Sequence, residues 1–264
     1  MTAEPHRDLV EATLTEALAL AGERPAALLE AMRYAVLGGG KRIRPLVCLA
    51  AATAVGGAAE DARWPAAAIE ILHNYTLIHD DLPAMDNDTE RRGRPTVWKR
   101  FGEATAILAG DALLSLACRV AAKAPRNVEA IIAALGDAGV GVVRGQAEEL
   151  STVADGARRP STDPDDFIYR HKTADLFVAA ATMGALAAGG SIDQVAALAD
   201  FALNLGLAFQ YEDDRLDGDG LFAPDETERR ARAATDAAIA ALSPLPGDTT
   251  FLRQLAERLM ERKN

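Results

Sequence analysis

The sequence predicts an all-α protein that folds as one domain over residues 1–264. Its hydrophobic residues are mostly alanine and leucine, which are strong helix formers, whereas aromatic residues make up only 5% of the chain. Hydrophobic residues recur with the helical period along most of the sequence, and no alternating pattern typical of strands stands out. We therefore expect a single helical domain, with ample chain for one core and roughly eight to ten helices.

Each predicted helix is bounded by a glycine, a proline or a polar break. The first helix presents Leu9, Thr13, Ala17 and Leu20 on one face. The second ends at the glycine run that begins at Gly38, a strong helix terminator. The second and later helices are expected over residues 24–37, 46–55, 64–81, 104–122, 127–153, 165–188, 191–216, 226–242 and 251–263.

The composition excludes several classes of protein. The formal net charge is −11, so the chain lacks the basic footprint that a nucleic-acid-binding protein needs. The longest apolar stretch, residues 176–190, is shorter than the ~18–20 residues of a membrane span, and the first residues show no signal-peptide pattern. Cys48 and Cys118 sit inside apolar runs, as reduced core thiols do. We expect a cytoplasmic protein with no nucleic-acid partner and no membrane span.

The first of two acidic clusters follows the helix expected over residues 64–81. Asp80 and Asp86 are six positions apart, which is about 240° around an ideal helix. They converge only if the helix breaks between them, and Pro83 supplies that break. Asp81 adds a third carboxylate to this cluster.

The second acidic cluster ends the helix expected over residues 191–216. Asp213 and Asp217 stand at i and i+4 and point the same way. Clustered carboxylates repel each other unless a cation neutralises them, and oxygen ligands favour Mg²⁺ over zinc or copper. Mg²⁺ usually takes one or two carboxylates together with substrate phosphates, so the clusters predict a phosphorylated ligand. The alternative is two ordinary acidic helix ends, which the helix dipole opposes.

Basic residues gather in three further segments, at residues 38–45, 90–96 and 169–173. In an acidic protein such segments are natural anchors for anionic groups, and arginine side chains suit phosphate oxygens. Each segment alone is a weak signal, since a basic residue is more often a surface ion-pair partner. The glycine-led turn at residues 38–45 lacks the spacing and the preceding strand of a P-loop, which excludes that motif.

Taken together, these segments resemble the trans-isoprenyl diphosphate synthases of the polyprenyl synthetase family, closest to the bacterial farnesyl diphosphate synthase type. The resemblance runs from Gly38 to Asp217. Its motifs are Gly-Lys-Arg-x-Arg-Pro (40–45), the first aspartate-rich motif (80–86), Arg-Arg-Gly-x-Pro-Thr (91–96), Phe-Gly-Glu-Ala (101–104), Leu-Ala-Gly-Asp (108–111), Gly-Gln (145–146), His-Lys-Thr (171–173) and the second aspartate-rich motif (213–217). The resemblance implies an isoprenoid synthase-type helical bundle with a large central cavity.

The resemblance also implies a reaction and the residues that perform it. The reaction is the Mg²⁺-dependent condensation of isopentenyl diphosphate with an allylic diphosphate, with three Mg²⁺ ions bound alongside the substrate. The implied metal ligands are Asp80, Asp81, Asp86, Asp213 and Asp217. The implied allylic-diphosphate residues are Arg91, Lys172, Thr173 and Gln210. The implied isopentenyl-diphosphate residues are Gly40, Lys41, Arg44, His73 and Arg92. The residues implied in catalysis are Asp80, Asp86, Asp213 and Lys172.

Product length is expected to depend on the helix that presents Asp80. Tyr75 lies five residues upstream, ~7.5 Å along the helix axis, and Thr76 follows it. The resemblance places Tyr75 where a bulky aromatic residue forms the floor of the chain pocket, and it implies a C15 farnesyl product. The alternative is that Tyr75 packs elsewhere, with its hydroxyl group on a backbone carbonyl.

A homodimer is expected from the helix over residues 104–122. This helix carries more apolar surface than one face of a peripheral helix needs. Its large apolar residues include Ile107, Leu108, Leu114 and Leu116. The resemblance implies that it packs against its symmetry mate.

The sequence departs from the family pattern after Asp217. Members of the family usually carry two lysines there, but no lysine occurs between Lys172 and Lys263. Residues 218–264 therefore form an atypical, shortened C-terminal part. The arginines that are candidates to replace these cations are Arg215, Arg229 and Arg230.

Three smaller departures occur inside the motifs. Trp98 stands where a histidine is usual, Glu149 replaces an aspartate and Arg144 replaces a glycine.

Two alternatives to an active prenyl synthase stay open. One is a catalytically weak or inactive paralogue that acts as a partner subunit, which the missing lysines favour. The other is a terpene cyclase, which is disfavoured because Lys41, Arg44 and Arg92 provide a second diphosphate site that a cyclase does not need. His73 also has an alternative role, because a histidine on an apolar helix is often a packed core residue.

Overall fold

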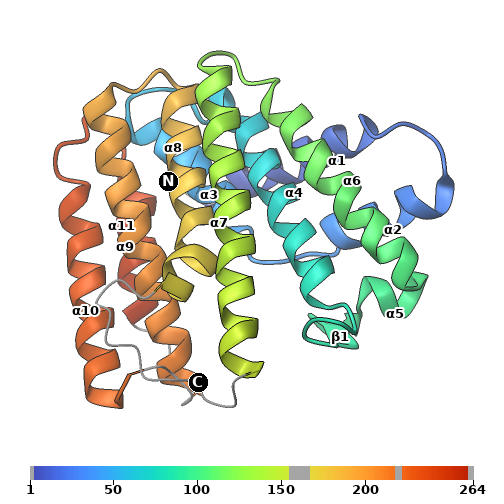
Figure 1. Cartoon of the computed structure of the whole chain (residues 1–264). Helices are drawn as coiled ribbons and strands as arrows, with labels where there is room; N and C mark the ends of the chain where they lie inside the picture. Colours follow the sequence, from blue (N-terminus) through green and yellow to red (C-terminus); the bar gives the residue numbers. More distant parts are fainter. Residues whose placement is uncertain (1–2, 155–166, 218–221, 261–264) are drawn as a thin grey trace.

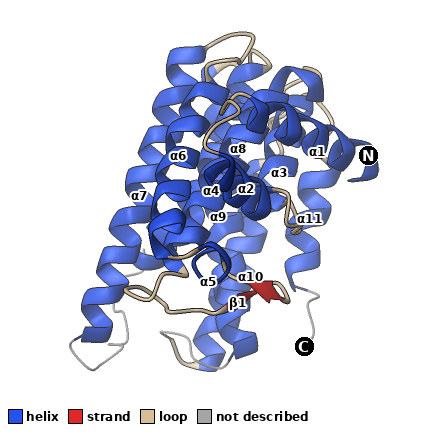
Figure 2. Cartoon of the chain, turned by 90° about the vertical axis from the view of Figure 1, so that its right-hand side faces the viewer, coloured by secondary structure: helices blue, strands red, loops and turns tan. Residues whose placement is uncertain are grey.

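The computed structural model describes residues 3–154, 167–217 and 222–260, and these residues form a bundle of α-helices (Figures 1 and 2). The helices are α1 (Ala3–Ala19), α2 (Ala26–Val36), α3 (Ile43–Ala54), α4 (Arg63–Asp80), α5 (Val97–Phe101), α6 (Glu103–Ala121), α7 (Val128–Ala154), α8 (Asp175–Ala187), α9 (Ile192–Asp217), α10 (Pro224–Ala241) and α11 (Thr250–Met260). A 3₁₀ turn, η1 (Ala59–Ala62), and a π-helical segment, η2 (Tyr169–Ala174), complete the helical part. The predicted all-α class is confirmed.

Most of the long helices lie within a few residues of their predicted bounds, but the helix predicted over residues 165–188 is divided into the π-helical segment η2 and α8, which begins at Asp175. The prediction also missed several short elements. α5 was not expected, and neither was the hairpin of β1 (Glu90–Arg91) and β2 (Arg94–Pro95). α3 begins three residues earlier than predicted, so that Pro45 lies inside its first turn. A proline is tolerated there because the N–H groups of the first turn have no intrahelical partner.

The buried face of α1 also differs from the predicted one. Thr13 and Ala17 are fully buried as expected, but Leu9 and Leu20 are only partly buried. The residues that complete the buried face are Val10, Leu14 and Leu18. Thr13 tolerates burial because its hydroxyl group donates to the carbonyl of Leu9 at 2.7 Å.

The helices that carry the predicted site end on one side of the bundle. α4, α7 and α9 all run in the same direction in Figure 1, so their carboxyl-terminal ends lie at the same end of the bundle, and the hairpin follows the end of α4. α4 packs against α6 and α3, and α8 packs against α3, α7 and α9. Glycines permit the closest of these approaches, since an added Cβ at Gly184 of α8 would collide with the backbone of Cys48 in α3.

The π-helical segment η2 is held between two helices by glycines. An added Cβ at Gly145 of α7 would collide with the backbone of Lys172, and one at Gly206 of α9 would collide with Ala174. A π-helical segment inserts an extra residue into a helix, and such segments are frequent at functional sites. The fold therefore fixes the position of Lys172 and Thr173, which the resemblance places at the allylic diphosphate.

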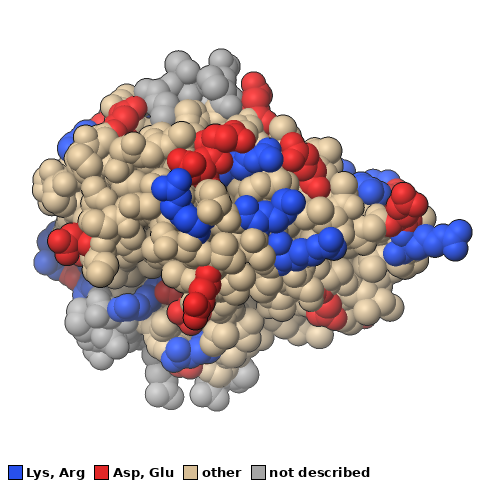
Figure 3. Space-filling model, turned by 90° about the horizontal axis from the view of Figure 1, so that it is seen from above, with Lys and Arg blue, Asp and Glu red and all other residues tan. Residues whose placement is uncertain are grey.

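Charged side chains of both signs are interspersed on the end of the bundle seen from above (Figure 3). In the part of the chain that the structure describes, α6 and α9 are long and apolar enough to cross a membrane by length and composition alone. α6 packs against α4, and α9 packs against α8 and α10. Core helices pass the same length and composition test, so this is weak evidence for a membrane span.

Candidate active site

Five residues predicted to bind isopentenyl diphosphate line one cavity of about 490 Å³. These residues are Gly40, Lys41, Arg44, His73 and Arg92. They come from the glycine turn before α3, from α3, from α4 and from the tip of the hairpin. We call this space the basic cavity. Phe209 of α9 and Glu70 of α4 also line it.

The basic cavity holds positive charge that lacks a bound partner. Arg44 Nη1 lies 3.4 Å from His73 Nε2. Arg44 Nε and His73 Nδ1 are buried, and no partner among the described residues reaches either atom. Burial lowers the pKa of Arg44 to about 10, and the Arg92 cation also lowers it while Glu70 opposes the shift. An anion in the cavity would relieve both the unpaired donors and the repulsion between the arginines.

His73 is neutral in this environment. Burial and then the Arg44 cation lower the pKa of His73 well below its usual value. A neutral ring lets Nε2 accept a hydrogen bond while Nδ1 carries the proton. His73 is therefore a member of the basic cavity and not only a packed core residue.

Arg42, the middle cation of the glycine turn, is buried, and two carboxylates pair with its guanidinium. Its backbone is left-handed, with φ of 54°, and its guanidinium forms ion pairs with Glu11 and Glu70, each at 2.7 Å. Burial opposes its charge, but these two carboxylates together raise the pKa of Arg42. The turn thus divides its cations: Lys41, Arg42 and Arg44 all line the cavity, but the Arg42 guanidinium is committed to Glu11 and Glu70.

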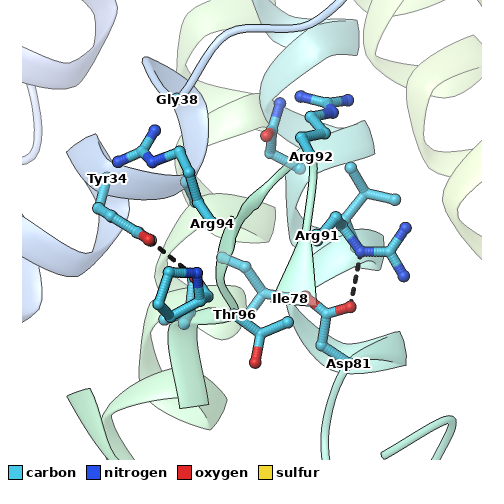
Figure 4. A pocket seen from close by; sticks show the side chains of 13 residues that line it. Tyr34, Gly38, Ile78, Asp81, Arg91, Arg92, Arg94 and Thr96 are labelled. Carbon is cyan, nitrogen blue, oxygen red and sulfur yellow. Dashed lines mark hydrogen bonds and ion pairs between the residues drawn. The ribbon is translucent and has the colours of Figure 1, made fainter. Parts of the chain in front are cut away.

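The hairpin after the first acidic cluster has a two-residue turn formed by Arg92 and Gly93. Both have positive φ, at 56° and 72°, which is the type I′ geometry that two-residue hairpins favour. Arg92 at the tip donates to the carbonyl of Gly39 at 2.5 Å. Tyr34 anchors the other strand by donating to the carbonyl of Pro95 at 2.7 Å (Figure 4). The motif therefore places one arginine, Arg92, at the basic cavity.

The first acidic cluster lies on a loop that begins where α4 ends, as Pro83 predicted. The N–H of Asp86 donates to the carbonyl of Asp80 at 2.9 Å, so the two residues are brought together across the break. Burial raises the pKa of Asp80 to about 6, with Asp86 and Asp81 adding to the shift and Lys172 opposing it. Burial and neighbouring carboxylates also raise the pKa values of Asp81 and Asp86.

Asp81 is paired with a cation, because Arg91 Nε donates to its carboxylate at 2.6 Å (Figure 4). Arg91 also reaches Asp88 at 3.3 Å. Asp81 is almost fully buried, with 3% of its surface exposed. The arginine predicted to hold diphosphate is therefore paired with a predicted metal ligand.

Lys172 links the π-helical segment to the first acidic cluster. Its ammonium group pairs with Glu149 of α7. Its charge also acts on Asp80 and Asp86, and it lowers the pKa of both carboxyl groups against the effect of burial. Glu149, named from the sequence only as a departure from the family motif, is thus the partner of Lys172.

A hydrogen-bond network joins the π-helical segment to α9. Thr173 Oγ1 donates to Gln210 Oε1 at 2.9 Å, and Gln210 Nε2 donates to Asp214 Oδ1 at 2.9 Å. The other carboxylate oxygen of Asp214 accepts a hydrogen bond from the Tyr169 hydroxyl group. Because a carboxylate only accepts, the amide of Gln210 is oriented with its nitrogen toward Asp214. Tyr169 and Asp214 were not predicted, and the Asp213–Asp214 pair in the motif was the available signal.

The second acidic cluster is described only in part. Asp213 is partly buried in the last two turns of α9, and Asp217 is the final residue of that helix. The side chain of Asp217 lies outside the described residues. The predicted ligand set is therefore placed on α4, its following loop and the carboxyl-terminal end of α9.

The donor chemistry of these clusters fits Mg²⁺. All the candidate ligands are carboxylates, and burial with mutual repulsion raises the pKa values of the three that precede the hairpin. Within the described ranges, no three His, Cys, Asp or Glu side chains form a group that holds a metal ion by itself. Mg²⁺ usually takes one or two carboxylates and completes its shell with phosphate oxygens and water.

Tyr75 lines an apolar pocket of about 280 Å³ between α4, α6 and α7. The pocket extends past Tyr75 to Leu72, one turn further from Asp80, and its other walls include Leu114 and Gly139. The Tyr75 ring packs edge-on against His79 at 5.1 Å between centroids. Thr76 is buried and its hydroxyl group donates to the carbonyl of His73 at 2.8 Å, so its polar atom is committed to its own helix.

The arginines near the shortened C-terminal part pair with their own helices. Arg215 pairs with Glu212 at 2.8 Å, and Arg230 pairs with Glu226 at 2.6 Å. Arg229 also pairs with Glu226. Residues 218–221, where the family motif would continue, lie outside the described residues.

Trp98 stabilises the loop of the first acidic cluster, because its indole N–H donates to the carbonyl of Asp88 at 2.7 Å. Trp98 stands at the position where the family usually has a histidine.

Comparison with known proteins defines the class. The profile of the polyprenyl synthetase family matches residues 25–236. In solved structures, the chain superposes on an FPP/GFPP synthase from Zymomonas mobilis with a TM-score of 0.85 at 35% identity, covering 98% of this chain and 100% of the other. It superposes on a geranylgeranyl pyrophosphate synthetase from Pyrococcus horikoshii with a TM-score of 0.88 at 28% identity, covering 97% and 96%.

Curated relatives agree in sequence. The large subunit 1 of a heterodimeric geranylgeranyl pyrophosphate synthase from Arabidopsis thaliana is 43% identical over 221 residues, or 80% of this chain and 58% of the relative. A geranylgeranyl pyrophosphate synthase from Capsicum annuum is 42% identical over 215 residues, or 79% and 57%. The chain spans a little over half the length of these plant relatives. The structure has the all-α prenyl synthase fold, and the chain belongs to the polyprenyl synthetase family.

Proposed function

We propose that the chain is a short-chain prenyl diphosphate synthase that condenses isopentenyl diphosphate with an allylic diphosphate. The observation that carries this proposal is the basic cavity, where five residues predicted from separate motifs line one space. A second group, made of Asp80, Asp86, Lys172 and Glu149, interacts nearby at the end of α4. A basic site and an acidic site in one bundle suit a reaction of two diphosphates.

In this proposal the two diphosphates bind by different chemistry. Lys41, Arg44 and Arg92 bind the diphosphate of isopentenyl diphosphate directly, and the neutral ring of His73 supports Arg44. The carboxylates of both acidic clusters would hold Mg²⁺ for the allylic diphosphate, and the metal would supply positive charge to stabilise the leaving diphosphate. The allylic diphosphate also contacts Arg91, Lys172, Thr173 and Gln210.

The bond changes of the proposed reaction balance without a redox partner. The allylic C–O bond breaks and the diphosphate leaves with the electron pair. The double bond of isopentenyl diphosphate attacks the allylic cation, which forms one C–C bond, and the departing diphosphate takes the proton that restores a double bond. The protein contributes binding, orientation and charge stabilisation, so no side chain needs to act as a base.

The product in this proposal is C15 farnesyl diphosphate, with C20 geranylgeranyl diphosphate as the competing product. Tyr75 supports the shorter product, because its ring stands in the apolar pocket along α4. The names of the plant relatives support the longer one, as does the space that continues past Tyr75 to Leu72.

A homodimer formed through α6 and α7 completes the proposal. Leu108 of α6 is 57% exposed and Val140 of α7 is 62% exposed. The exposed apolar surface of these two helices also includes Ile107, Leu114 and Val143. A partner copy would cover this surface. A cytoplasmic location is part of the proposal. The partner-subunit alternative is less favoured, because the residues of the basic cavity and of the first acidic cluster are intact.

The decisive experiment is an assay of the purified protein with Mg²⁺, isopentenyl diphosphate and each allylic diphosphate in turn. We expect products that chromatography resolves as C15 or C20. Arg44→Ala should abolish condensation, while Arg119→Ala, a change at an exposed arginine that donates to the Leu20 carbonyl, should not. Absence of product from every allylic substrate would overturn the proposed function.

A further inference from the structure

α1 contacts the glycine turn that leads into the basic cavity. Arg7 Nη1 donates to the carbonyl of Gly40 at 3.1 Å, and Arg7 Nη2 donates to the carbonyl of Lys41 at 3.0 Å. One guanidinium group therefore binds two consecutive carbonyls of the turn. A planar guanidinium fits such a pair of acceptors, whereas an ammonium group has no equivalent fork.

Glu11, one helical turn after Arg7, makes the second contact between α1 and the turn. Its carboxylate accepts hydrogen bonds from Arg42 Nε at 2.7 Å and from Arg42 Nη2 at 3.2 Å. The Arg42 guanidinium also donates to Glu70 of α4 and to the carbonyl of Val36 in α2, both at 2.7 Å. Arg42 is thus held by α1, α2 and α4 together.

These contacts maintain a backbone conformation that a residue with a side chain disfavours. Arg42 has φ of 54°, and left-handed backbone at a non-glycine residue persists only where its surroundings enforce it. Lys41 precedes Arg42, and Arg44 follows it in the first turn of α3. Both line the basic cavity. The backbone conformation at Arg42 therefore determines whether both Lys41 and Arg44 reach the basic cavity.

We infer that Arg7 and Glu11 are positioning residues for the isopentenyl-diphosphate site, an inference that rests on the proposed function. Neither residue lines the cavity, and the family profile begins at residue 25. They act through the turn: Arg7 fixes the carbonyls of Gly40 and Lys41, and Glu11 fixes the side chain of Arg42. The allylic side of the site, at η2 and α9, makes none of these contacts.

The inference is tested by steady-state kinetics with each substrate varied separately. Arg7→Ala and Glu11→Gln should each raise the Michaelis constant for isopentenyl diphosphate by about fivefold, the effect of losing one or two ordering hydrogen bonds. The turnover number and the Michaelis constant for the allylic diphosphate should stay within about twofold of wild type. Glu16→Gln is the matched control, since Glu16 lies on the same helix and pairs with Arg63 instead.

Arg7→Lys separates geometry from charge. It keeps the positive charge but loses the two-pronged contact, so we expect an intermediate Michaelis constant for isopentenyl diphosphate. Wild-type behaviour of Arg7→Lys combined with a defect in Arg7→Ala would show that charge alone matters, and it would overturn the inference. An equal rise in both Michaelis constants would also overturn it, because that is the result of a general loss of structure.

A binding measurement keeps this inference separate from the proposed function. Inorganic diphosphate is titrated into metal-free protein by calorimetry, where the acidic clusters repel it and the basic cavity provides the site. Arg44→Ala should abolish this binding, and Arg7→Ala and Glu11→Gln should weaken it by about fivefold. Wild-type binding without turnover would contradict the proposed function alone. Unchanged binding in both α1 variants would contradict the inference alone.

Discussion

Arg44 and His73 approach each other inside the basic cavity, with Arg44 Nη1 3.4 Å from His73 Nε2. An arginine so close to a histidine requires a neutral ring, because a protonated ring would repel it. Burial and the Arg44 cation together lower the pKa of His73 well below its usual value. The pair therefore keeps its full positive charge on the arginine, where a diphosphate can be bound by the fork of the guanidinium.

The neutral state of His73 predicts a pH-dependent contribution to stability. The unfolded chain binds a proton on this histidine near its ordinary pKa of about 6.5, whereas the folded protein does not. The contribution of His73 is thus fully present above pH ~6.5 and is lost as the pH falls toward the folded pKa. His73→Gln should reduce the acid-side slope of unfolding free energy by up to about 1.4 kcal/mol per pH unit. Denaturant melts of the wild-type and His73→Gln proteins from pH 7.5 to pH 5 would measure how the unfolding free energy of each changes with pH. A difference between the two changes of less than roughly 0.5 kcal/mol would contradict the prediction.

Asp80 should destabilise the metal-free protein at neutral pH. Its pKa is raised to about 6 by burial and by Asp86 and Asp81. A raised carboxyl pKa contributes stability below the unfolded value, and this is lost as the pH rises through about 6. Asp80→Asn should therefore stabilise the metal-free protein at pH 7.5 by about 1–3 kcal/mol and abolish turnover. Thermal and denaturant melts in chelator measure the first effect.

Asp193→Asn is the control for that prediction, since Asp193 lies in the first turn of α9, at the opposite end of the helix from Asp213. It should leave both stability and activity close to wild type. A marked loss of metal-free stability in Asp80→Asn, with activity retained, would contradict the assignment of Asp80 to the metal site.

Tyr75 should set the depth of the apolar pocket. Tyr75→Ala removes the ring from a pocket that already continues to Leu72, so the products should lengthen by at least one C5 unit with little effect on the first condensation. Tyr75→Phe retains the bulk and should retain the product length. Chromatography of the products from each variant gives the answer, and an unchanged distribution in Tyr75→Ala would show that another residue limits the chain.

Tyr169 should act on the reaction through Asp214 and Gln210. Tyr169→Phe removes one donor from a buried carboxylate, which then holds Gln210 and Thr173 less firmly. The specificity constant for the allylic diphosphate should fall by roughly three- to tenfold, as expected for one hydrogen bond. A double-mutant cycle checks the route. In a Gln210→Leu background Tyr169→Phe should have little further effect, whereas additive losses would mean that Tyr169 acts independently.

The sequence was most informative where a motif and its local geometry coincide. Helix periodicity located most of the long helices, and Pro83 correctly indicated that the helix ends between Asp80 and Asp86. The roles of the three cations in the glycine turn could not be assigned in this way, because the left-handed backbone at Arg42 depends on Glu11 and Glu70 from distant helices. Tertiary contacts, and not propensity, decide which of them is buried.

Other parts of the site were hidden for the same reason. The hairpin strands are two residues long, too short for any periodic pattern to reveal them. Tyr169 gains its role only because the π-helical segment brings its hydroxyl group to Asp214. The apolar pocket beside Tyr75 is likewise lined by three helices, so the sequence around Tyr75 alone was insufficient to predict its depth.

The ion pair between Arg91 and Asp81 couples the two ligands of the proposed allylic site, the metal and the diphosphate. The guanidinium of Arg91 pairs with a carboxylate that is also a predicted metal ligand. If Asp81 binds Mg²⁺, the ion would compete with Arg91 for this carboxylate, and a released guanidinium would be available to a diphosphate. Either ligand therefore lowers the cost of binding the other, and thermodynamic reciprocity requires the gain to be equal in both directions. We expect the metal and the allylic substrate to load as a pair, so that each protects the protein only weakly when offered alone.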